Sequence, residues 1–331
     1  MGIKKRILER RERLCGDCFG CWRRACLRPD FGAASIGRYW RRQRGSAWSA
    51  SALGRRFWAQ AAAAALTNGN LPGWLTGRLY NGPLKAVCVP GLNCYSCPGA
   101  LGACPVGSWQ ISLSGSFPRV SAYVLGLLLL FALALGRVVC GWLCPFGCVQ
   151  ELLHRVPVPK LGKRPWMRPL TQLRWAMLGL VAVGPLAAFF ATGTGKPLFC
   201  AYVCPAGTLE GALPLITLRP ELFASTGWTL AWKIAVLVLL LFAMAAVYRP
   251  FCRFLCPLGL WYGFWNRFAL CGVTVDAAKC VQCGRCAELC PMDAQIAGDP
   301  QCISCGKCVD ACPVKAISFR RLQRKAEETV Q

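Results

Sequence analysis

Three long apolar runs alternate with polar, cysteine-containing stretches in the middle of the chain. Residues 120–139 contain one charge, Arg137, near the end, residues 175–195 contain none, and residues 226–248 contain only Lys233. Each run is long enough to cross a hydrocarbon core of about 30 Å as a helix. Tryptophans near the ends of the runs are typical of helices anchored at a membrane surface. The pattern therefore predicts membrane-spanning helices rather than the core helices of a soluble protein.

A weaker apolar run covers residues 57–75. It is rich in alanine and is interrupted by Asn68, Gly69 and Pro72, so it fits a short spanning helix, a re-entrant helix or a soluble helix. In the second of the stronger runs, Pro185 predicts a kink. Lys233 is expected to extend toward the membrane surface. The four runs together predict an α-helical integral membrane protein with about four transmembrane helices.

Charge is distributed unevenly along the chain. The 39 basic and 14 acidic residues give a net charge of +25, and the basic ones concentrate in the first 45 residues and in the loop at 150–174. Affinity for anionic lipid and retention of basic loops in the cytoplasm explain this better than nucleic-acid binding. We therefore expect this loop in the cytoplasm, with His154 as a solvated loop residue. No cleavable signal peptide is apparent, because the basic N-terminal segment has no apolar core.

Many of the 24 cysteines fall into patterns that are typical of metal ligation. The first strong apolar run ends in a C-x3-C-P motif, and the motif returns 112 residues later. The aligned positions are Arg137 and Arg249, Cys140 and Cys252, Cys144 and Cys256, Pro145 and Pro257, and Gly147 and Gly259. Two thiols cannot complete a four-cysteine cluster site, but two copies that face each other can. We expect the two copies to hold an iron–sulfur cluster at the cytoplasmic surface of the membrane.

A third copy of the motif, Cys200 and Cys204, follows a helix that runs the other way. Counting crossings places it on the outer side and the C-terminus in the cytoplasm, and the N-terminus is also cytoplasmic if residues 57–75 cross. A glycine- and proline-rich loop on the same side carries Cys88, Cys94, Cys97 and Cys104. We expect Cys200 and Cys204 to form an outer site with Cys97 and Cys104, since both of these precede proline as Cys204 does.

The other cysteines of this middle region have less defined roles. Cys88 and Cys94 are left as a disulfide on the oxidising side, or as ligands in a different partition. Cys148 and Cys271 are interpreted as small buried hydrophobic residues.

An N-terminal group of four cysteines has the spacing C-x2-C-x2-C-x4-C. Its members are Cys15, Cys18, Cys21 and Cys26. The first three match a cluster-binding loop, but the last gap is one residue longer than in bacterial ferredoxins and no proline follows. An additional cluster, a four-cysteine zinc site and free thiols in a basic tail are the alternatives.

The region at 271–320 contains two copies of C-x2-C-x2-C-x3-C-P. The fourth cysteine of each copy ligates the other cluster in two-cluster ferredoxins. The first [4Fe-4S] cluster is therefore expected on Cys280, Cys283, Cys286 and Cys312, and the second on Cys302, Cys305, Cys308 and Cys290. The predicted organisation is a basic cytoplasmic segment at 1–45, a membrane domain at 46–270, an α+β ferredoxin domain at 271–320 and a polar tail at 321–331.

The motifs CGWLCP and CRFLCP together with the doubled ferredoxin motif resemble those of the membrane-bound polyferredoxins of bacteria and archaea. This group includes quinol-dehydrogenase and maturation proteins that accompany periplasmic nitrate and nitrous-oxide reductases. The resemblance covers residues 85–320 and does not include the N-terminal cysteines. It implies a multi-pass protein of the prokaryotic cytoplasmic membrane that moves single electrons between quinol, flavin or cluster partners.

The preferred interpretation is an electron conduit that connects cytoplasmic redox partners with membrane or extracytoplasmic ones. Its partners would be a flavoprotein, a ferredoxin or a flavodoxin-like protein. Arg137 and Arg249 would stabilise an anionic thiolate cluster, and helix packing or lipid-headgroup contact is the alternative role for them. A quinol dehydrogenase subunit that binds quinone, and a redox-sensing or reductase-maturation factor, are the alternative functions.

Overall fold

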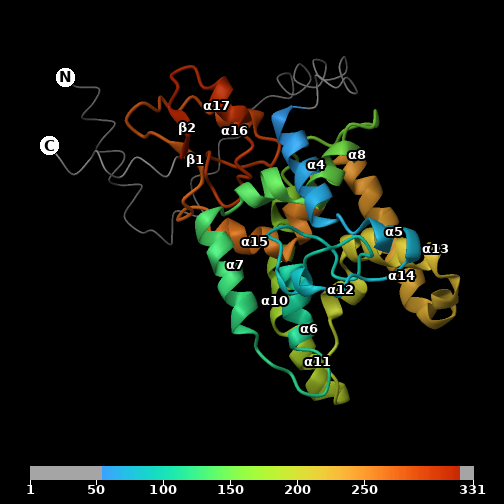
Figure 1. Cartoon of the computed structure of the whole chain (residues 1–331). Helices are drawn as coiled ribbons and strands as arrows, with labels where there is room; N and C mark the ends of the chain where they lie inside the picture. Colours follow the sequence, from blue (N-terminus) through green and yellow to red (C-terminus); the bar gives the residue numbers. More distant parts are fainter. Residues whose placement is uncertain (1–53, 321–331) are drawn as a thin grey trace, which may run out of the picture. The chain divides into compact units, whose positions relative to one another are not determined.

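The computed structural model describes residues 54–320, which lie within one compact unit, Ser46–Gln331 (Figure 1). The elements are, in chain order, α4 (Arg55–Thr67), α5 (Leu71–Thr76), η2 (Pro83–Ala86), α6 (Pro105–Ser112), α7 (Ala122–Ala134), η3 (Val139–Leu143), α8 (Pro145–Leu153), α9 (Met167–Leu170), α10 (Leu173–Ala182), α11 (Gly184–Thr192), α12 (Leu198–Tyr202), η4 (Gly207–Ala212), α13 (Leu213–Leu218), η5 (Pro220–Leu222), α14 (Phe223–Ala246), η6 (Phe251–Leu255), α15 (Pro257–Trp265), β1 (Gly272–Val275), α16 (Arg285–Leu289), α17 (Lys307–Ala311) and β2 (Ile317–Arg320). The predicted N-terminal cysteine group and polar tail lie outside the described residues.

The apolar runs form helices of unequal length. Among residues 54–320, one helix is long and apolar enough to cross a membrane alone, the stretch Gly227–Ala246 of α14. The bent pair Met167–Ala182 and Gly184–Thr192 is a second candidate if its two halves count as one span. Its 50° bend lies at Val183, two residues before the predicted kink at Pro185. By length and composition, the described part therefore has one or two candidate spans, and the four-span arrangement stays a prediction.

The runs at 57–75 and 120–139 form shorter helices than predicted. The run at 57–75 divides into α4 and α5, because Asn68 caps the end of α4 and the chain turns there. α7 has 13 residues, and its first turn is capped by the Ser121 hydroxyl, which accepts from the Val124 N–H. The interruption predicted at Asn68 and Gly69 is thus present in the structure.

Cysteine–proline pairs determine where the helices around the cysteines begin. α6, α8 and α15 each start at a proline, and the cysteine before each proline is extended, with ψ of 128°, 117° and 113°. Proline at the first helical position loses no hydrogen bond, because that N–H has no partner within a helix. It also keeps the preceding residue extended. Each thiol therefore projects from the start of a helix instead of being covered by it.

The C-terminal part has the two-strand, two-helix arrangement expected of a bacterial-type ferredoxin. β1 pairs antiparallel with β2, with Val273 opposite Phe319. The two cysteine loops repeat the same backbone, since left-handed conformations occur at three matching pairs of positions, namely Gln282 and Ser304, Gly284 and Gly306, and Asp293 and Lys315. The two predicted ferredoxin-type [4Fe-4S] loops thus have the same backbone conformation in the structure.

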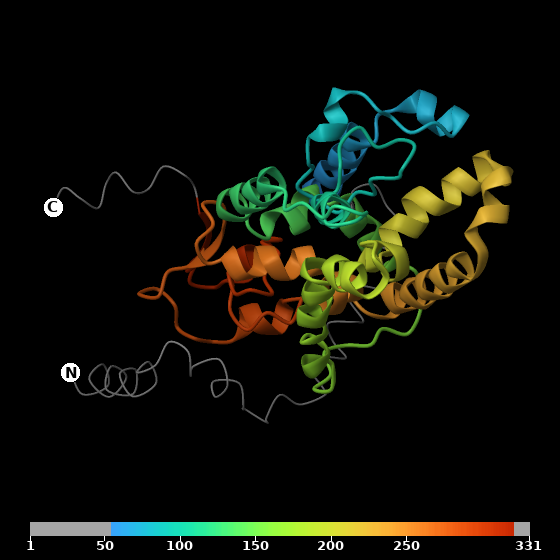
Figure 2. The same cartoon turned by 90° about the horizontal axis from the view of Figure 1, so that it is seen from below.

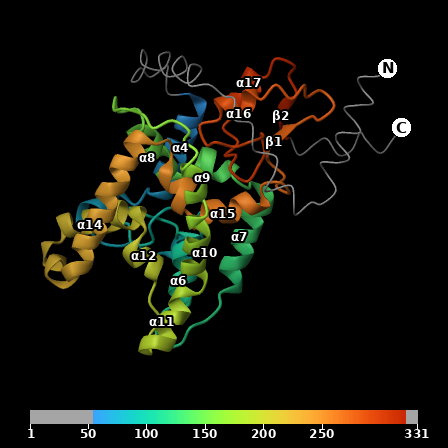
Figure 3. The same cartoon turned by 180° about the vertical axis from the view of Figure 1, so that it is seen from behind.

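Different views show how these elements are arranged. β1, β2, α16 and α17 lie at one end, and α11 lies at the other, with α6 and α12 at an intermediate level (Figure 1; Figure 3). α13 and α14 form a hairpin that projects to one side (Figure 2). The cysteine-bearing helix starts therefore lie between the ferredoxin part and the far end of the helices.

The histidine of the basic loop is not solvated as predicted. His154 is partly buried, its Nδ1 lies 3.3 Å from the Met244 carbonyl oxygen, and its ring packs edge-on against Tyr248. Burial, together with nearby Lys160, lowers the pKa of His154 to about 4. The imidazole is therefore neutral at physiological pH and belongs to the packing between the basic loop and α14.

Candidate cluster sites

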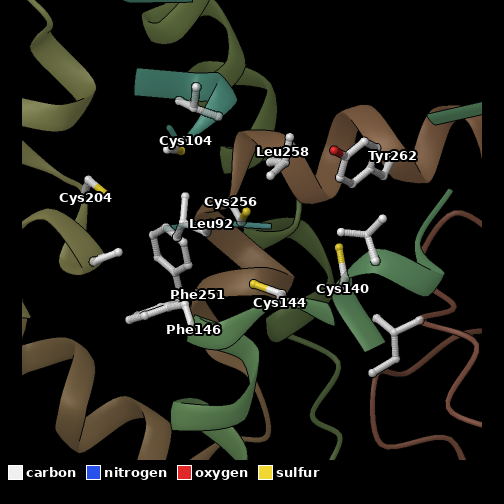
Figure 4. Packing of buried hydrophobic residues seen from close by; sticks show 14 of the residues in the cluster. Leu92, Cys104, Cys140, Cys144, Phe146, Cys204, Phe251, Cys256, Leu258 and Tyr262 are labelled. Atoms are coloured by element: carbon white, nitrogen blue, oxygen red, sulfur yellow. The ribbon is translucent and has the colours of Figure 1, made fainter. Parts of the chain in front are cut away.

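The two aligned C-x3-C-P copies face each other, as predicted. Cys140, Cys144, Cys252 and Cys256 are only 4–7% exposed, and Figure 4 shows Cys140, Cys144 and Cys256 around one space. The Gly259 N–H donates to the Cys256 sulfur at 3.3 Å. The Gln150 amide donates to the Cys252 sulfur at 2.9 Å. We call this group of four cysteines the inner site.

Two fully buried arginines cross between the copies. The Arg137 guanidinium donates to the Cys252 carbonyl at 3.4 Å, and the Arg249 guanidinium donates to the Cys140 carbonyl. A methyl group at Gly259 would lie 3.1 Å from Arg137, and one at Gly147 would lie 3.1 Å from Arg249. Each copy thus extends an arginine into the other copy, and a glycine of the receiving copy leaves room for that arginine.

The charges of the inner site fit an anionic group between the copies. Arg249 pairs with Glu151 at 2.8 Å, but among the described residues Arg137 has no ion-pair partner, and the Nε atoms of both arginines have no hydrogen-bond partner. A buried charge is costly unless it is compensated. A [4Fe-4S] cluster on four thiolates is an anion. Complete burial excludes the lipid-headgroup role for both arginines.

The motif around these cysteines extends beyond the residues that we aligned between the two copies, and it occurs four times. Each copy reads C-P-x-G-x2 followed by a polar residue, namely CPVGSWQ at 104–110, CPFGCVQ at 144–150, CPAGTLE at 204–210 and CPLGLWY at 256–262. The last positions are Gln110, Gln150, Glu210 and Tyr262, one turn or more into the helix. A seven-residue frame shared by all four copies is the signal that identifies these polar residues in the sequence.

In three copies the polar residue reaches a cysteine of the opposing copy. Gln150 Nε2 donates to the Cys252 sulfur at 2.9 Å. Gln110 Oε1 accepts from the Cys200 N–H at 3.1 Å, and Glu210 Oε2 accepts from the Cys94 N–H at 2.8 Å. The cysteine reached is in each case the one that is not followed by proline. By this relation Cys94 occupies the position that Cys140, Cys200 and Cys252 occupy in their copies.

A second group of four cysteines, which we call the outer site, consists of Cys94, Cys104, Cys200 and Cys204. Cys200 and Cys204 interact electrostatically with Cys104, and Cys94 interacts with Cys204. A methyl group at Gly211 would lie 3.0 Å from the Cys94 sulfur. The structure therefore places Cys94 in this group, where the sequence favoured Cys97.

The remaining cysteines of the outer loop and of the helices lie elsewhere. The Cys97 thiol points to Asn68 Oδ1, at 3.6 Å. Cys88 is buried beside Ala103, with which it forms an isolated β-bridge, and both Cys88 and Cys94 are free thiols. Cys148 and Cys271, predicted to be buried, are only half-buried.

The outer loop also touches the inner site. A methyl group at Gly91 would lie 3.1 Å from the Cys144 Cα, and the Tyr262 hydroxyl donates to the Pro90 carbonyl at 2.8 Å. Cys94 follows Gly91 by three residues, and an extended chain of three residues spans at most about 11 Å. Leu92 lies between the groups (Figure 4). The inner and outer sites are therefore neighbours rather than groups on opposite membrane faces.

A cation faces the outer site as well. Lys233, which we expect to extend toward the membrane surface, has its Nζ 3.8 Å from the methyl position of Gly207, near Cys200. Its extension toward the membrane surface stays a prediction. A polar position in an apolar run shows where a charge lies but not which face of the helix carries it.

The second ferredoxin site is a cavity lined by all four of its predicted ligands. These are Cys290, Cys302, Cys305 and Cys308, and Cys286 of the first motif also lines the cavity. Burial raises the pKa of Cys290 to about 11 and that of Cys308 to about 12. The bare thiols are therefore neutral at pH 7, and their deprotonation is coupled to metal binding.

The first ferredoxin site is more accessible. Cys283 is exposed, Cys280, Cys286 and Cys312 are half-buried, and the Ala316 N–H donates to the Cys312 sulfur at 3.3 Å. Among residues 54–320, no three Cys, His, Asp or Glu side chains converge on a single ion position. Cluster ligands are spaced more widely than the ligands of one ion, because each thiolate binds a different iron.

Comparison with known proteins identifies the chain's family. A model described as a 4Fe-4S binding domain matches residues 117–164, 174–213 and 228–270, and a second model with the same description matches 273–296 and 301–318. The first of these covers the three C-x3-C-P pairs, and the second covers both ferredoxin loops. The family models thus recognise the regions that carry the inner site, both ferredoxin sites and the Cys200–Cys204 half of the outer site, whereas Cys94 and Cys104 precede the matched residues.

Several curated proteins are similar over part of their length. The methylamine utilization ferredoxin-type protein MauN of Methylorubrum extorquens is 30% identical over 65% of this chain and 70% of its own. The ferredoxin-type protein NapH of Haemophilus influenzae is 31% identical over 53% of this chain and 54% of its own. The regulatory protein NosR of Pseudomonas aeruginosa is 30% identical over 48% of this chain and 20% of its own.

The chain spans about half to three fifths of the length of the first curated relatives it matches. No solved structure matches it significantly. The resemblance predicted from the cysteine motifs is confirmed by the family models and by the relatives. The chain therefore belongs to the family of membrane-associated ferredoxin-type proteins of the polyferredoxin kind, whose cofactors are [4Fe-4S] clusters.

Proposed function

We propose that the chain is an electron conduit that passes single electrons between the ferredoxin part on the cytoplasmic side and the inner and outer sites within the membrane. A [4Fe-4S] cluster supplies one-electron chemistry, and the protein tunes its potential through charge, hydrogen bonds and burial. The observation that carries the proposal is the placement of four cysteine sites in series within one compact unit. A protein that only stored or sensed metal would not need neighbouring sites.

The proposed ligands follow from the contacts described above. They are Cys280, Cys283, Cys286 and Cys312 for the first ferredoxin site, Cys302, Cys305, Cys308 and Cys290 for the second, Cys140, Cys144, Cys252 and Cys256 for the inner site, and Cys94, Cys104, Cys200 and Cys204 for the outer site. Arg137 and Arg249 would compensate the charge of the inner cluster. The fourth cysteine of each ferredoxin motif is assigned to the other cluster by the two-cluster pattern.

The proximity of the inner and outer sites supports transfer between them. Electron tunnelling weakens steeply with distance, and a hydrocarbon core of about 30 Å separates the two membrane surfaces. Sites on opposite surfaces would need a further cofactor between them. The contact of Gly91 with Cys144 and the short chain from Gly91 to Cys94 remove that need for this step.

The proposed orientation follows the positive-inside rule. The basic loop at 150–174 and the ferredoxin part would lie in the cytoplasm of a prokaryotic cell, and the far end, with α11 and the start of α7, would face outward. α4, α7, the bent pair and α14 would supply four membrane segments of unequal length. Cys15, Cys18, Cys21 and Cys26 would add a further cytoplasmic site.

The partners proposed are redox proteins of the cluster or flavin type, such as a flavoprotein, a ferredoxin or a flavodoxin-like protein. The exposed Cys283 places the first ferredoxin site where such a soluble protein can approach. The relatives' names link ferredoxin-type proteins to methylamine utilization, which is a statement about those relatives.

A second candidate function is quinol oxidation, and one cavity favours it. A wholly apolar cavity of about 110 Å³ opens between α6, α7, α10 and α15, and Trp109 and Trp261 line it. Val106 and Pro257, which also line it, belong to the motif copies that carry Cys104 and Cys256. A quinol bound there would lie beside both membrane sites. Reduction of the clusters by a quinol, blocked by a quinol analogue, distinguishes this function from a pure carrier.

The assignment of the outer site is tested by a matched pair of substitutions. Cys94→Ala should remove one cluster signal from the EPR spectrum and about four irons, the content of one [4Fe-4S] cluster. Cys97→Ala, three residues away, should retain both, because its thiol faces Asn68. The measurement is iron and sulfide content with EPR on anaerobically purified protein. Loss of the signal in Cys97→Ala with its retention in Cys94→Ala would reverse the assignment.

Transfer across the membrane is tested in sealed vesicles with a donor on one side and an impermeant acceptor on the other. Cys200→Ala should lose transfer, whereas Cys97→Ala should transfer at the parent rate, because only Cys200 belongs to the outer site. Tags after residue 165 and at the C-terminus should face the cytoplasmic side of the same membrane, and a tag at Gly193, at the end of α11, should not. A Cys200→Ala protein that transfers as fast as the parent would leave a one-sided carrier.

A further inference from the structure

The two halves of the inner site differ at the position after their first cysteine. Cys140 is followed by Gly141, and Cys252 is followed by Arg253. The flanking arginines, prolines and glycines of the two copies are identical, whereas the residues at this position differ. Both of these unmatched residues contact the ferredoxin part of the chain.

Gly141 lies directly against the loop of the second ferredoxin site. A methyl group there would come within 2.1 Å of the Ile303 carbonyl oxygen, which is closer than any side chain tolerates. Ile303 follows the ligand Cys302. Next to Gly141, the Trp142 indole N–H donates to the Ser304 carbonyl at 3.0 Å. Glycine at 141 therefore allows the loop that carries Cys302 to touch the loop that carries Cys140.

Arg253 holds the other side of the same ferredoxin site. Its guanidinium donates to Asp293 at 2.7 Å, and both side chains are at most 10% exposed. Asp293 follows the ligand Cys290 by three residues. The Lys163 ammonium of the basic loop donates to the Glu288 carbonyl at 2.9 Å, just before Cys290. Arg253 and Gly141 thus contact opposite ends of one ligand set, Cys290 and Cys302.

Further contacts fix the segment between these points. The Asn266 amide donates to the carbonyls of Asp299, at 2.9 Å, and Cys302, at 3.3 Å, and accepts from the Arg137 N–H. The Arg137 guanidinium donates to the Pro300 carbonyl at 2.7 Å. The same arginine reaches the Cys252 carbonyl, so a single side chain joins the two sites.

From these contacts we infer that electrons pass directly between the second ferredoxin site and the inner site, and that Gly141 and Arg253 are the positioning residues that hold these two sites together. The inference rests on the proposed function and adds the order of transfer to it. The clusters held there would exchange one electron, one being oxidised as the other is reduced, and no bond would form or break. The more exposed first ferredoxin site would exchange electrons with the soluble partner.

The experiment uses the full chain in detergent, with all clusters loaded. Gly141→Ala should keep the parent iron content but lose the magnetic interaction between the second ferredoxin cluster and the inner cluster in EPR spectra of the reduced protein. Transfer between the ferredoxin part and the inner site should slow severalfold, because electron tunnelling weakens steeply with distance. Gly126→Ala is the matched control, because nothing lies within 4 Å of its methyl position.

A second variant tests the other contact without steric strain. Asp293→Asn removes the charge that pairs with Arg253, and asparagine tolerates the left-handed conformation of this residue, φ 59°. It should weaken the same magnetic interaction at full iron content. Asp276→Asn, at a solvent-exposed ion pair with Lys279, should not.

Cys280→Ala, which removes the first ferredoxin cluster, should leave the interaction intact. Parent spectra in which all clusters are present without any interaction, or an interaction that disappears in Cys280→Ala, would overturn the inferred order and leave the proposed function in place. Normal coupling in both Gly141→Ala and Asp293→Asn would refute the positioning role. Absence of the membrane clusters from the parent protein would refute the proposed function itself, and with it the inference.

Discussion

The compensation of two buried guanidinium groups is the interaction on which the rest of the structure depends. Arg137 and Arg249 are fully buried, and each donates to a cysteine carbonyl of the opposite motif copy. Burial of a cation is costly unless negative charge lies nearby. Glu151 supplies one such charge, to Arg249, and the cluster proposed between the copies would supply the rest. The two copies would then be held in register by the group that they bind.

The same seven-residue frame produces both membrane sites. The cysteine–proline pair starts a helix with a free thiol, the glycine at the fourth position allows close approach, and the polar residue at the seventh reaches the opposing copy. Gln110, Gln150 and Glu210 follow this rule, and Tyr262 departs from it by binding the Pro90 carbonyl. That departure brings the loop before Cys94 against Cys144. The exception in the fourth copy is thus what makes the two sites neighbours.

Sequence reasoning succeeded where spacing alone defines the geometry. The ferredoxin loops and the facing pairs at Cys140 and Cys252 follow from local motifs, and the structure brings them together. Sequence reasoning favoured Cys97 over Cys94 because Cys97 is followed by proline. In the three C-x3-C-P pairs, however, only the second cysteine is followed by proline, and the first cysteine is not. The burial of His154 depends on packing between distant segments, which periodicity does not encode. Gly141 is the clearest case, because its role is determined by Ile303, a residue 162 positions away.

The most direct test of the account asks whether the two facing copies share one cluster. Cys140→Ala and Cys252→Ala should each be purified anaerobically and compared with the parent protein by iron content and EPR. If the copies share a site, both variants lose the same spectroscopic signal and the same amount of iron, and the double variant loses no more. Loss of two different signals, or additive loss of iron in the double variant, would show that each copy binds its own metal and would contradict the account.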